Sequence, residues 1–262
     1  MSIRNTIRPL MTVVLACIAG TAIASLGTGV VPSAGQVEAR LATTHLPFIA
    51  NTGQVPNPEV VLYARMFAGT LFVTEDGDLV YSLLGNRVAG VAPSVAFAES
   101  FVNSSRPAAS PTGIEPSAVA VSQFKGPDPG AWRGRLPTWN AVDLGERYPG
   151  IRITLRAAGN NVEKLFHVAP GGEVGSIDVV VEGAEGLELV ADGRLVLRTA
   201  LGDVVFTAPE AYQVIDGRRR PVTVAYAVTD DDHYGFSVGV YDRRRELVID
   251  PLIASTFLGG HN

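Results

Sequence analysis

The chain has 262 residues, of which 47% are hydrophobic and 18% are charged, and its formal net charge is −5 at pH 7. An acidic balance of this kind argues against nucleic acid and anionic membrane surfaces as partners. Cys17 is the single cysteine, which excludes an intramolecular disulfide framework and a cysteine-based metal site.

The first predicted element is an export signal. Arg4 and Arg8 precede an uncharged apolar stretch that ends in small residues, which is the layout of a secretory signal peptide. We therefore predict a signal peptide over residues 1–24, a flexible leader over 25–44, and a secreted or cell-surface location. Two alternatives stay open: a membrane anchor, although Gly, Thr and Ser dilute the apolar stretch, and lipid attachment at Cys17.

Beyond the leader, period-two alternation and β-branched runs are broken at short intervals by turn residues. This pattern predicts an all-β protein with an antiparallel, β-sandwich-like fold, in one large or two small lobes rich in hairpins. Gly77 can take the positive φ that the first hairpin turn requires. The strand pairs of the four expected hairpins are 71–73 with 79–83, 187–189 with 195–197, 212–215 with 222–226, and 236–241 with 247–249.

Residues 103–117 interrupt this pattern, because they hold three prolines among small polar residues. Such a composition predicts a long loop rather than a strand. We place this loop inside an N-terminal β lobe over residues 45–160 and assign residues 161–251 to a C-terminal β lobe. Residues 252–262 are expected to begin a truncated propeller repeat.

The segment from Phe124 to Pro149 carries Trp132, Trp139 and Tyr148 among glycines and prolines. It predicts an ordered connection in which the aromatic side chains are buried. The competing interpretation is that Trp132 and Trp139 bind a ligand, since aromatic faces can stack on the apolar faces of sugars.

Asp230, Asp231 and Asp232 form the densest cluster of carboxylates, and carboxylate oxygens can hold a hard cation. The cluster lies between two β-like runs and lacks the alternating spacing of an EF-hand loop, so a solvated turn is the competing interpretation. No zinc-ligand pair or nucleophile elbow accompanies it. We predict no cofactor and no enzymatic activity.

The chain ends with an apolar, β-competent run after the break at Pro251. Unpaired strand edges invite pairing with another chain, so this run is predicted to dock by β-augmentation. The expected partner is a β-propeller supplied in trans or a second copy of the chain. The predicted contact residues are Ile253, Thr256, Phe257 and Leu258.

Six sequence blocks, in order, resemble the N-terminal domain of bacterial seven-bladed β-propeller (SBBP) repeat proteins. They resemble the family's Asn-x-Gly-Gln opening, its Gly-x-Asp-Pro-x-x-Trp segment, its Pro-Thr-Tyr and Tyr-Pro-Gly-Ile blocks, its Ala-Pro-Gly turn, and its junction with the first repeat. The blocks in this chain are Phe48–Val55, Phe124–Trp132, Pro137–Trp139, Tyr148–Ile151, Phe166–Gly171 and Leu247–Pro251.

The chain departs from that resemblance at two places. Arg152 stands where the family usually carries an acidic residue, and Glu163–Phe166 reads Glu-Lys-Leu-Phe instead of Glu-Tyr-Asp-Phe. The resemblance implies an exported, non-catalytic structural or adhesion module of a cell-surface protein that normally precedes a β-propeller. The alternative function is a carbohydrate-active enzyme or carbohydrate-binding module that uses the region of Trp132 and Trp139.

Overall fold

The structure, a computed structural model, describes residues 46–66, 68–85, 93–104, 110–124, 126–128, 130, 132–159, 161–251 and 253–254. The predicted signal peptide, the leader and Cys17 lie outside these ranges, as do Thr256, Phe257 and Leu258. No helix within the described ranges is long and apolar enough to cross a membrane. The regular structure is almost entirely β, which confirms the predicted fold class.

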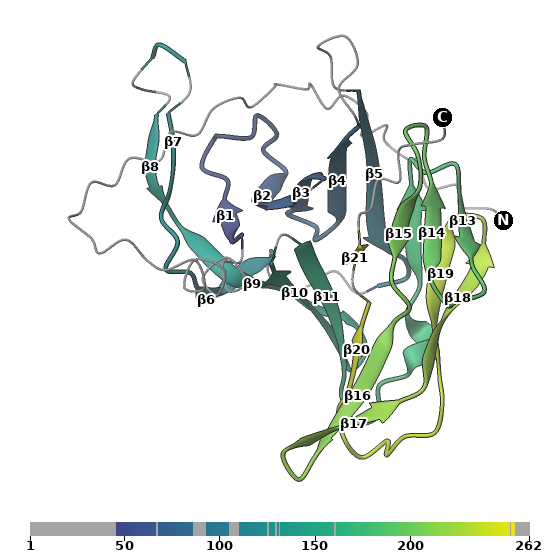
Figure 1. Ribbon diagram of the computed structural model, residues 1–262. Helices are drawn as coiled ribbons and strands as arrows, with labels where there is room; N and C mark the ends of the chain where they lie inside the picture. The colour runs from purple at the N-terminus through teal and green to yellow at the C-terminus, as the bar shows by residue number, and fades with distance from the viewer. Residues whose placement is uncertain are drawn as a thin grey trace, which may run out of the picture. The chain divides into compact units, whose positions relative to one another are not determined.

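One large antiparallel sheet carries most of the strands (Figure 1). In spatial order they are β17 (Arg218–Val222), β16 (Glu210–Ile215), β20 (Leu247–Asp250), β11 (Asn161–Val168), β10 (Ile151–Ala158), β9 (Thr138–Tyr148), β1 (Phe48–Ala50), β2 (Val60–Met66), β3 (Gly69–Thr74), β4 (Leu79–Leu84), β5 (Ser94–Phe101), β12 (Val179–Glu182), β19 (His233–Val238) and β18 (Val224–Asp230), with β6 (Thr112–Pro116) pairing on β9.

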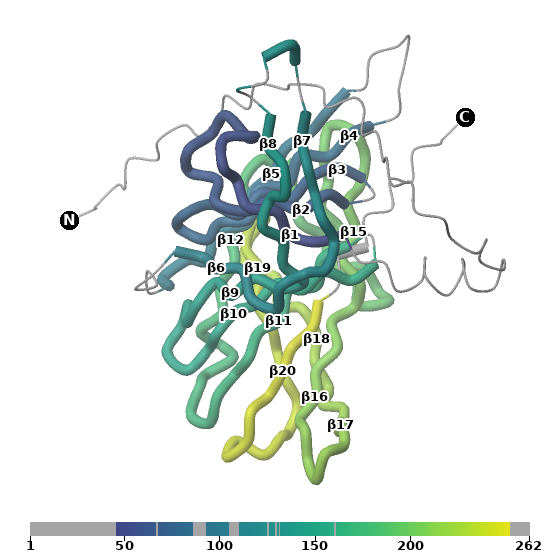
Figure 2. The backbone as a smooth tube through the Cα atoms, turned by 90° about the vertical axis from the view of Figure 1, so that its left-hand side faces the viewer, coloured from purple at the N-terminus to yellow at the C-terminus, as the bar shows by residue number. Residues whose placement is uncertain are grey.

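Two smaller sheets and one short helix complete the described structure. The four-stranded sheet contains β13 (Gly186–Leu189), β14 (Leu195–Arg198), β15 (Val204–Phe206) and β21 (Ile253–Ala254). The two-stranded sheet contains β7 (Val121–Gln123) and β8 (Arg133–Leu136), and the 3₁₀ helix η2 spans Val174–Ser176. In the view of Figure 2, the β7–β8 hairpin lies at the top of the described structure and the β16–β17 hairpin at the bottom.

The alternation of side chains explains why these segments form strands that bury one face. In β10, Ile151, Ile153 and Leu155 are fully buried, whereas Arg152 and Arg156 are exposed. Successive side chains of a strand point to opposite faces, so this pattern directs every second residue into the core. The first predicted hairpin is confirmed as β3–β4, and Gly77 in its turn has φ +82°.

The predicted boundary between two lobes is wrong, because it separates two strands of one hairpin. β10 and β11 pair along their whole length, from Ile151 with Val168 to Ala158 with Asn161. The described residues from 46 onward also belong to one compact unit and share one main core. β10 and β11, which lie on either side of the predicted boundary, share one ladder of backbone hydrogen bonds.

Two of the predicted hairpins are also corrected. The Asp216–Gly217 turn is present, but its second strand is β17, and β18 begins only after Thr223. Residues 236–241 and 247–249 do not pair with each other, because β19 pairs with β12 and β18 while β20 pairs with β11 and β16. A turn-like sequence between two strands therefore marked a connection between distant parts of the sheet.

The predicted loop at 103–117 contains a strand. β6 pairs with β9, with Gly113 opposite Val142 and Ile114 opposite Ala141. Glu115 has φ +56° and no partner in β9, and the pairing resumes in the same register at Pro116. Proline and glycine are tolerated here because β6 pairs on one side only, within the described strand pairings.

Candidate functional site

Trp132 lies at the tip of the β7–β8 hairpin and is exposed. The residue is 43% accessible, and Phe124, which is 66% accessible, packs edge-on against it with ring centroids 5.7 Å apart. The other end of the hairpin is buried, because Leu136 packs with Ile49 and Tyr63. The predicted burial of Trp132 is therefore wrong, because only the base of this two-stranded sheet reaches a hydrophobic cluster.

Local hydrogen bonds hold the aromatic tip in place. Trp132 Nε1 donates to the carbonyl of Gly126 at 3.2 Å, and the Gly130 N–H donates to Asp128 Oδ1 at 2.8 Å. Arg133 donates to the carbonyls of Gly130 and Thr52, so it ties the tip to the loop after β1. An exposed indole with its N–H already satisfied offers an apolar face at low entropic cost to a partner.

Trp139 has a structural position instead. It lies in β9 opposite Phe48 and Pro116, is partly buried, and packs against the main core. A Cβ atom on Gly113 would lie 2.1 Å from the indole Cδ2, so the ring fits only because residue 113 is glycine. Trp132 and Trp139 thus have different neighbours and different exposure, and of the two we retain Trp132 as the ligand-binding candidate.

The three aspartates lie where β18 turns into β19. Their side chains are exposed, and the carbonyls of Asp231 and Asp232 accept hydrogen bonds from Leu187 and Val181. Among the described residues, no group of three or more His, Cys, Asp or Glu side chains is arranged to hold a metal ion. Asp230, Asp231 and Asp232 therefore form a polar turn, and the predicted cation site gains no support.

The predicted interaction strand begins inside the structure. Ile253 and Ala254 form β21, which pairs with Phe206 and Val205 of β15. At these two residues the partner strand belongs to the same chain, in contrast to the expectation of an unpaired run. Thr256, Phe257 and Leu258 lie outside the described residues.

A surface pocket of about 300 Å³ lies over β10 and β11. His167 is one of the residues that line it: its Nε2 is 3.0 Å from Thr154 Oγ1, and its Nδ1 is 3.4 Å from Glu246 Oε1. Arg152 and Glu146 also line it. A hydroxyl, an imidazole and a carboxylate in this order can exchange protons or bind a ligand rich in hydroxyl groups.

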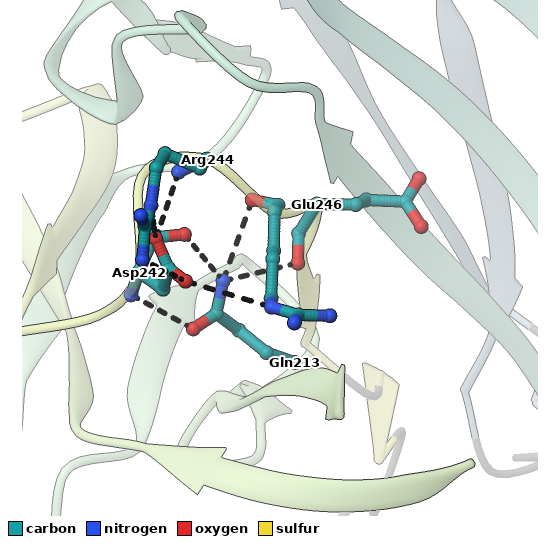
Figure 3. Close-up of polar contacts among 5 residues, drawn as sticks. Gln213, Asp242, Arg244 and Glu246 are labelled. Carbon is teal, nitrogen blue, oxygen red and sulfur yellow. Dashed lines mark hydrogen bonds and ion pairs between the residues drawn. The ribbon is translucent and has the colours of Figure 1, made fainter. Parts of the chain in front are cut away.

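Gln213 positions the segment that brings Glu246 to this pocket (Figure 3). Its Nε2 donates to the carbonyls of Asp242, Arg245 and Glu246, and its Oε1 accepts the Asp242 N–H. The Asp242 carboxylate also pairs with Arg244, which lowers the pKa of Asp242. The turn before β20 is thus held by one buried amide and by the ion pairs of Asp242 with Arg244 and Arg245.

A second polar cluster is completely enclosed. Lys164 Nζ lies 2.6 Å from Glu99 Oε1 and 2.6 Å from the Tyr234 hydroxyl, and Tyr81 donates to Glu99 Oε2 at 2.7 Å. The Lys164 side chain is 1% exposed and that of Glu99 is 0% exposed. Tyr234 also donates to Glu99 Oε1. The cluster joins β11 to β4, β5 and β19, although β11 is not their neighbour in the sheet.

Burial controls the ionisation of this cluster. Desolvation lowers the pKa of Lys164, and the attraction of Glu99 opposes that shift only in part. Desolvation first, and then the charge of Glu99, raises the pKa of both Tyr81 and Tyr234 well above the ordinary value, so both hydroxyls stay protonated.

Lys164 and Glu99 are not among the site residues predicted from the sequence, although the sequence carries a signal for them. Lys164 stands between Val162 and Phe166 at inward positions of β11, and Glu99 stands between Phe97 and Phe101 in β5. A charged residue at the inward parity of an otherwise apolar strand indicates a buried polar partner.

Comparison with known proteins identifies a family but no close relative. A family model described as a domain of unknown function, DUF7948, matches residues 48–252. No curated protein and no solved structure matches the chain. The matched range covers every strand from β1 to β20, including the exposed hairpin and the buried cluster.

Proposed function

The chain belongs to the DUF7948 family of domains of unknown function, and we propose that it is an exported, non-catalytic structural or adhesion module of a cell-surface protein. In this proposal the module precedes a β-propeller, as the resemblance to SBBP-repeat proteins implies, and holds its partner through the tip of the β7–β8 hairpin.

The observation that carries the proposal is the exposed pair of Phe124 and Trp132. Large aromatic side chains dominate the energetics of interfaces, and among the described residues Phe124 and Trp132 are the aromatic residues that are exposed, whereas the others are buried or partly buried. The hydrogen bonds of Gly126 and Arg133 order the tip before binding, which reduces the entropic cost of association.

The pocket at His167 favours the carbohydrate alternative. Thr154, His167 and Glu246 present a hydroxyl, an imidazole and a carboxylate to one cavity, and sugar hydroxyls can both donate to and accept from such groups. This pocket is built by β10, β11 and the segment before β20, so it is separate from the Trp132 tip in its residues.

Matched variants distinguish the two functions. Binding of the exported chain to a bacterial cell-wall preparation and to a polysaccharide panel is measured for wild type, Trp132→Ala and His167→Ala. The adhesion proposal predicts that Trp132→Ala weakens binding by about tenfold or more, with an unchanged melting temperature, while His167→Ala binds like wild type. The reverse pattern would transfer support to the pocket and to a carbohydrate-binding module.

A further inference from the structure

The buried contact between Lys164 and Glu99 places an amine against a carboxyl group in a site closed to solvent. We propose that these two side chains condense in the folded protein and form an intramolecular isopeptide bond between β11 and β5. The reaction needs no external reagent, and the two tyrosines of the cluster supply its proton transfer and its hydrogen-bond donors.

Proximity is the first requirement, and the fold supplies it. Lys164 Nζ is 2.6 Å from Glu99 Oε1, and both side chains lie at inward positions of strands whose other inward residues on either side of them are buried. Well-oriented intramolecular reactions reach effective concentrations of about 10⁵–10⁸ M. Condensation that is slow between free amines and acids in water can therefore proceed in this site.

The burial of the amine also favours reaction. Only the neutral amine has a lone pair, and burial lowers the pKa of Lys164. Transfer of one proton from Nζ to the Glu99 carboxylate converts the ion pair into a neutral amine and a carboxylic acid. A buried neutral pair avoids much of the desolvation cost of two buried charges.

The contacts assign a role to each atom. The Lys164 lone pair attacks Glu99 Cδ, and the new N–C bond forms. The Tyr234 hydroxyl touches both Nζ and Oε1, so it can pass one proton from Nζ to Oε1. The Cδ–Oε1 bond then breaks and one water molecule leaves. Oε2 remains as the amide oxygen, and the Tyr81 hydroxyl that already donates to it stabilises its charge during attack.

The isopeptide bond would join two strands that the backbone hydrogen bonds of the sheet do not connect. β5 pairs with β4 and β12, whereas β11 pairs with β10 and β20, so no backbone ladder joins β5 to β11. The single cysteine leaves the chain without an intramolecular disulfide. A covalent bond between residues 65 positions apart would supply an equivalent constraint.

Mass spectrometry of the purified chain tests the proposal. A tryptic digest of wild type is expected to contain the Glu99 and Lys164 peptides joined, with the loss of one water molecule, and to lack cleavage after Lys164. Lys164→Met and Glu99→Ala are expected to give only separate peptides of sequence mass, which can be measured whether or not these variants fold.

Two control variants distinguish formation of the isopeptide bond from other reactions that release water. Tyr234→Phe is expected to slow the appearance of the joined peptide by about tenfold or more, since it removes the proton relay. Tyr226→Phe, which removes a neighbouring buried hydroxyl that has no hydrogen-bond partner, should leave the rate unchanged. Separate peptides of sequence mass in folded wild type after prolonged incubation would overturn the proposal. So would a water loss that maps to an Asp-Gly sequence such as Asp216–Gly217.

Discussion

Gln213 and Asp242 are joined by two hydrogen bonds: the Asp242 N–H donates to Gln213 Oε1 at 2.9 Å, and Gln213 Nε2 donates to the Asp242 carbonyl at 2.9 Å. The two residues are 29 positions apart, and none of the hairpins predicted from the sequence places their segments side by side. This contact fixes the turn before β20 and therefore the course of the chain from β19, near one edge of the large sheet, to β20, near the other edge.

Loss of the Gln213 amide should destabilise the fold. Gln213 is 3% exposed, and its replacement by alanine would remove the hydrogen bonds of its side chain to the Asp242 N–H and to the carbonyls of Asp242, Arg245 and Glu246. We expect Gln213→Ala to lower the free energy of unfolding by about 2 kcal/mol. Val214→Ala is the control, because Val214 is 53% exposed on the next position of β16 and should change stability by less than about 0.5 kcal/mol. Equal effects of the two substitutions in urea denaturation would contradict the assigned role.

Replacing Gly113 by alanine should destabilise the fold more than replacing Gly134 by alanine. A Cβ atom there would meet the Trp139 ring at 2.1 Å, whereas a Cβ on Gly134 in β8 meets nothing within 4 Å. Gly113→Ala is expected to cost about 1–3 kcal/mol, and Gly134→Ala less than about 0.5 kcal/mol. Thermal unfolding of the two variants checks this difference. If both melt together with wild type, the close packing of β6 on Trp139 is not present in solution.

Asp250 should make stability depend on pH. Desolvation, followed by the charges of Glu163 and Glu210, raises the pKa of Asp250 from 3.8 to about 6. The folded state then binds this proton more tightly than the unfolded state, so the stabilisation is complete below about pH 4 and is lost as the pH rises through 6. Relative to wild type, Asp250→Asn should become more stable by about 1–2 kcal/mol between pH 4 and pH 7.5.

The control for that experiment is Asp203→Asn, since Asp203 is half exposed. It reports what the loss of one negative charge from the surface does to stability at each pH. A gain in stability of Asp250→Asn with rising pH that does not exceed that of this control would contradict the raised pKa of Asp250.

A chain that ends at Pro251 tests the predicted interaction strand. It lacks β21, so it loses the pairing of Ile253 and Ala254 with β15, and we expect it to stay folded with a loss of about 1 kcal/mol. If the removed residues dock on a second copy, light scattering should show concentration-dependent association for the full chain only. If both forms are monomeric at every concentration tested, these residues do not bind a second copy of the chain.

Local patterns predicted the strands well because their information is local. The alternation in β10 and the Gly77 turn of β3–β4 follow from side-chain parity and from a conformation that glycine adopts readily. The pairing of β19 and β20 with distant strands could not be predicted in this way. The segment between them has the composition of a hairpin turn, and the contact of Gln213 with residue 242 that redirects it is not encoded in neighbouring residues.

The candidate sites show the same limit. Trp132 and Trp139 lie in the same glycine- and proline-rich segment of the sequence. In the structure, however, Trp132 lies at a hairpin tip and Trp139 packs against Gly113. The charge at inward positions of β5 and β11 could have indicated a buried pair. Only the folded sheet shows that Glu99 and Lys164 are partners and that two tyrosines complete the cluster.

The most direct test of the central claim, that the chain binds its partner through Trp132, uses the fact that it contains two tryptophans. Trp139→Phe leaves Trp132 as the only indole, and Trp132→Phe leaves only Trp139. Fluorescence of each variant is measured with solubilised bacterial cell-wall fragments and with acrylamide as a quencher. The account predicts that binding shifts the Trp132 emission to shorter wavelength and lowers its quenching by about twofold or more, because a contact excludes water from the exposed ring, while Trp139 emission stays constant. An unchanged Trp132 signal at fragment concentrations that saturate binding of the wild-type chain, or a change confined to Trp139, would contradict it.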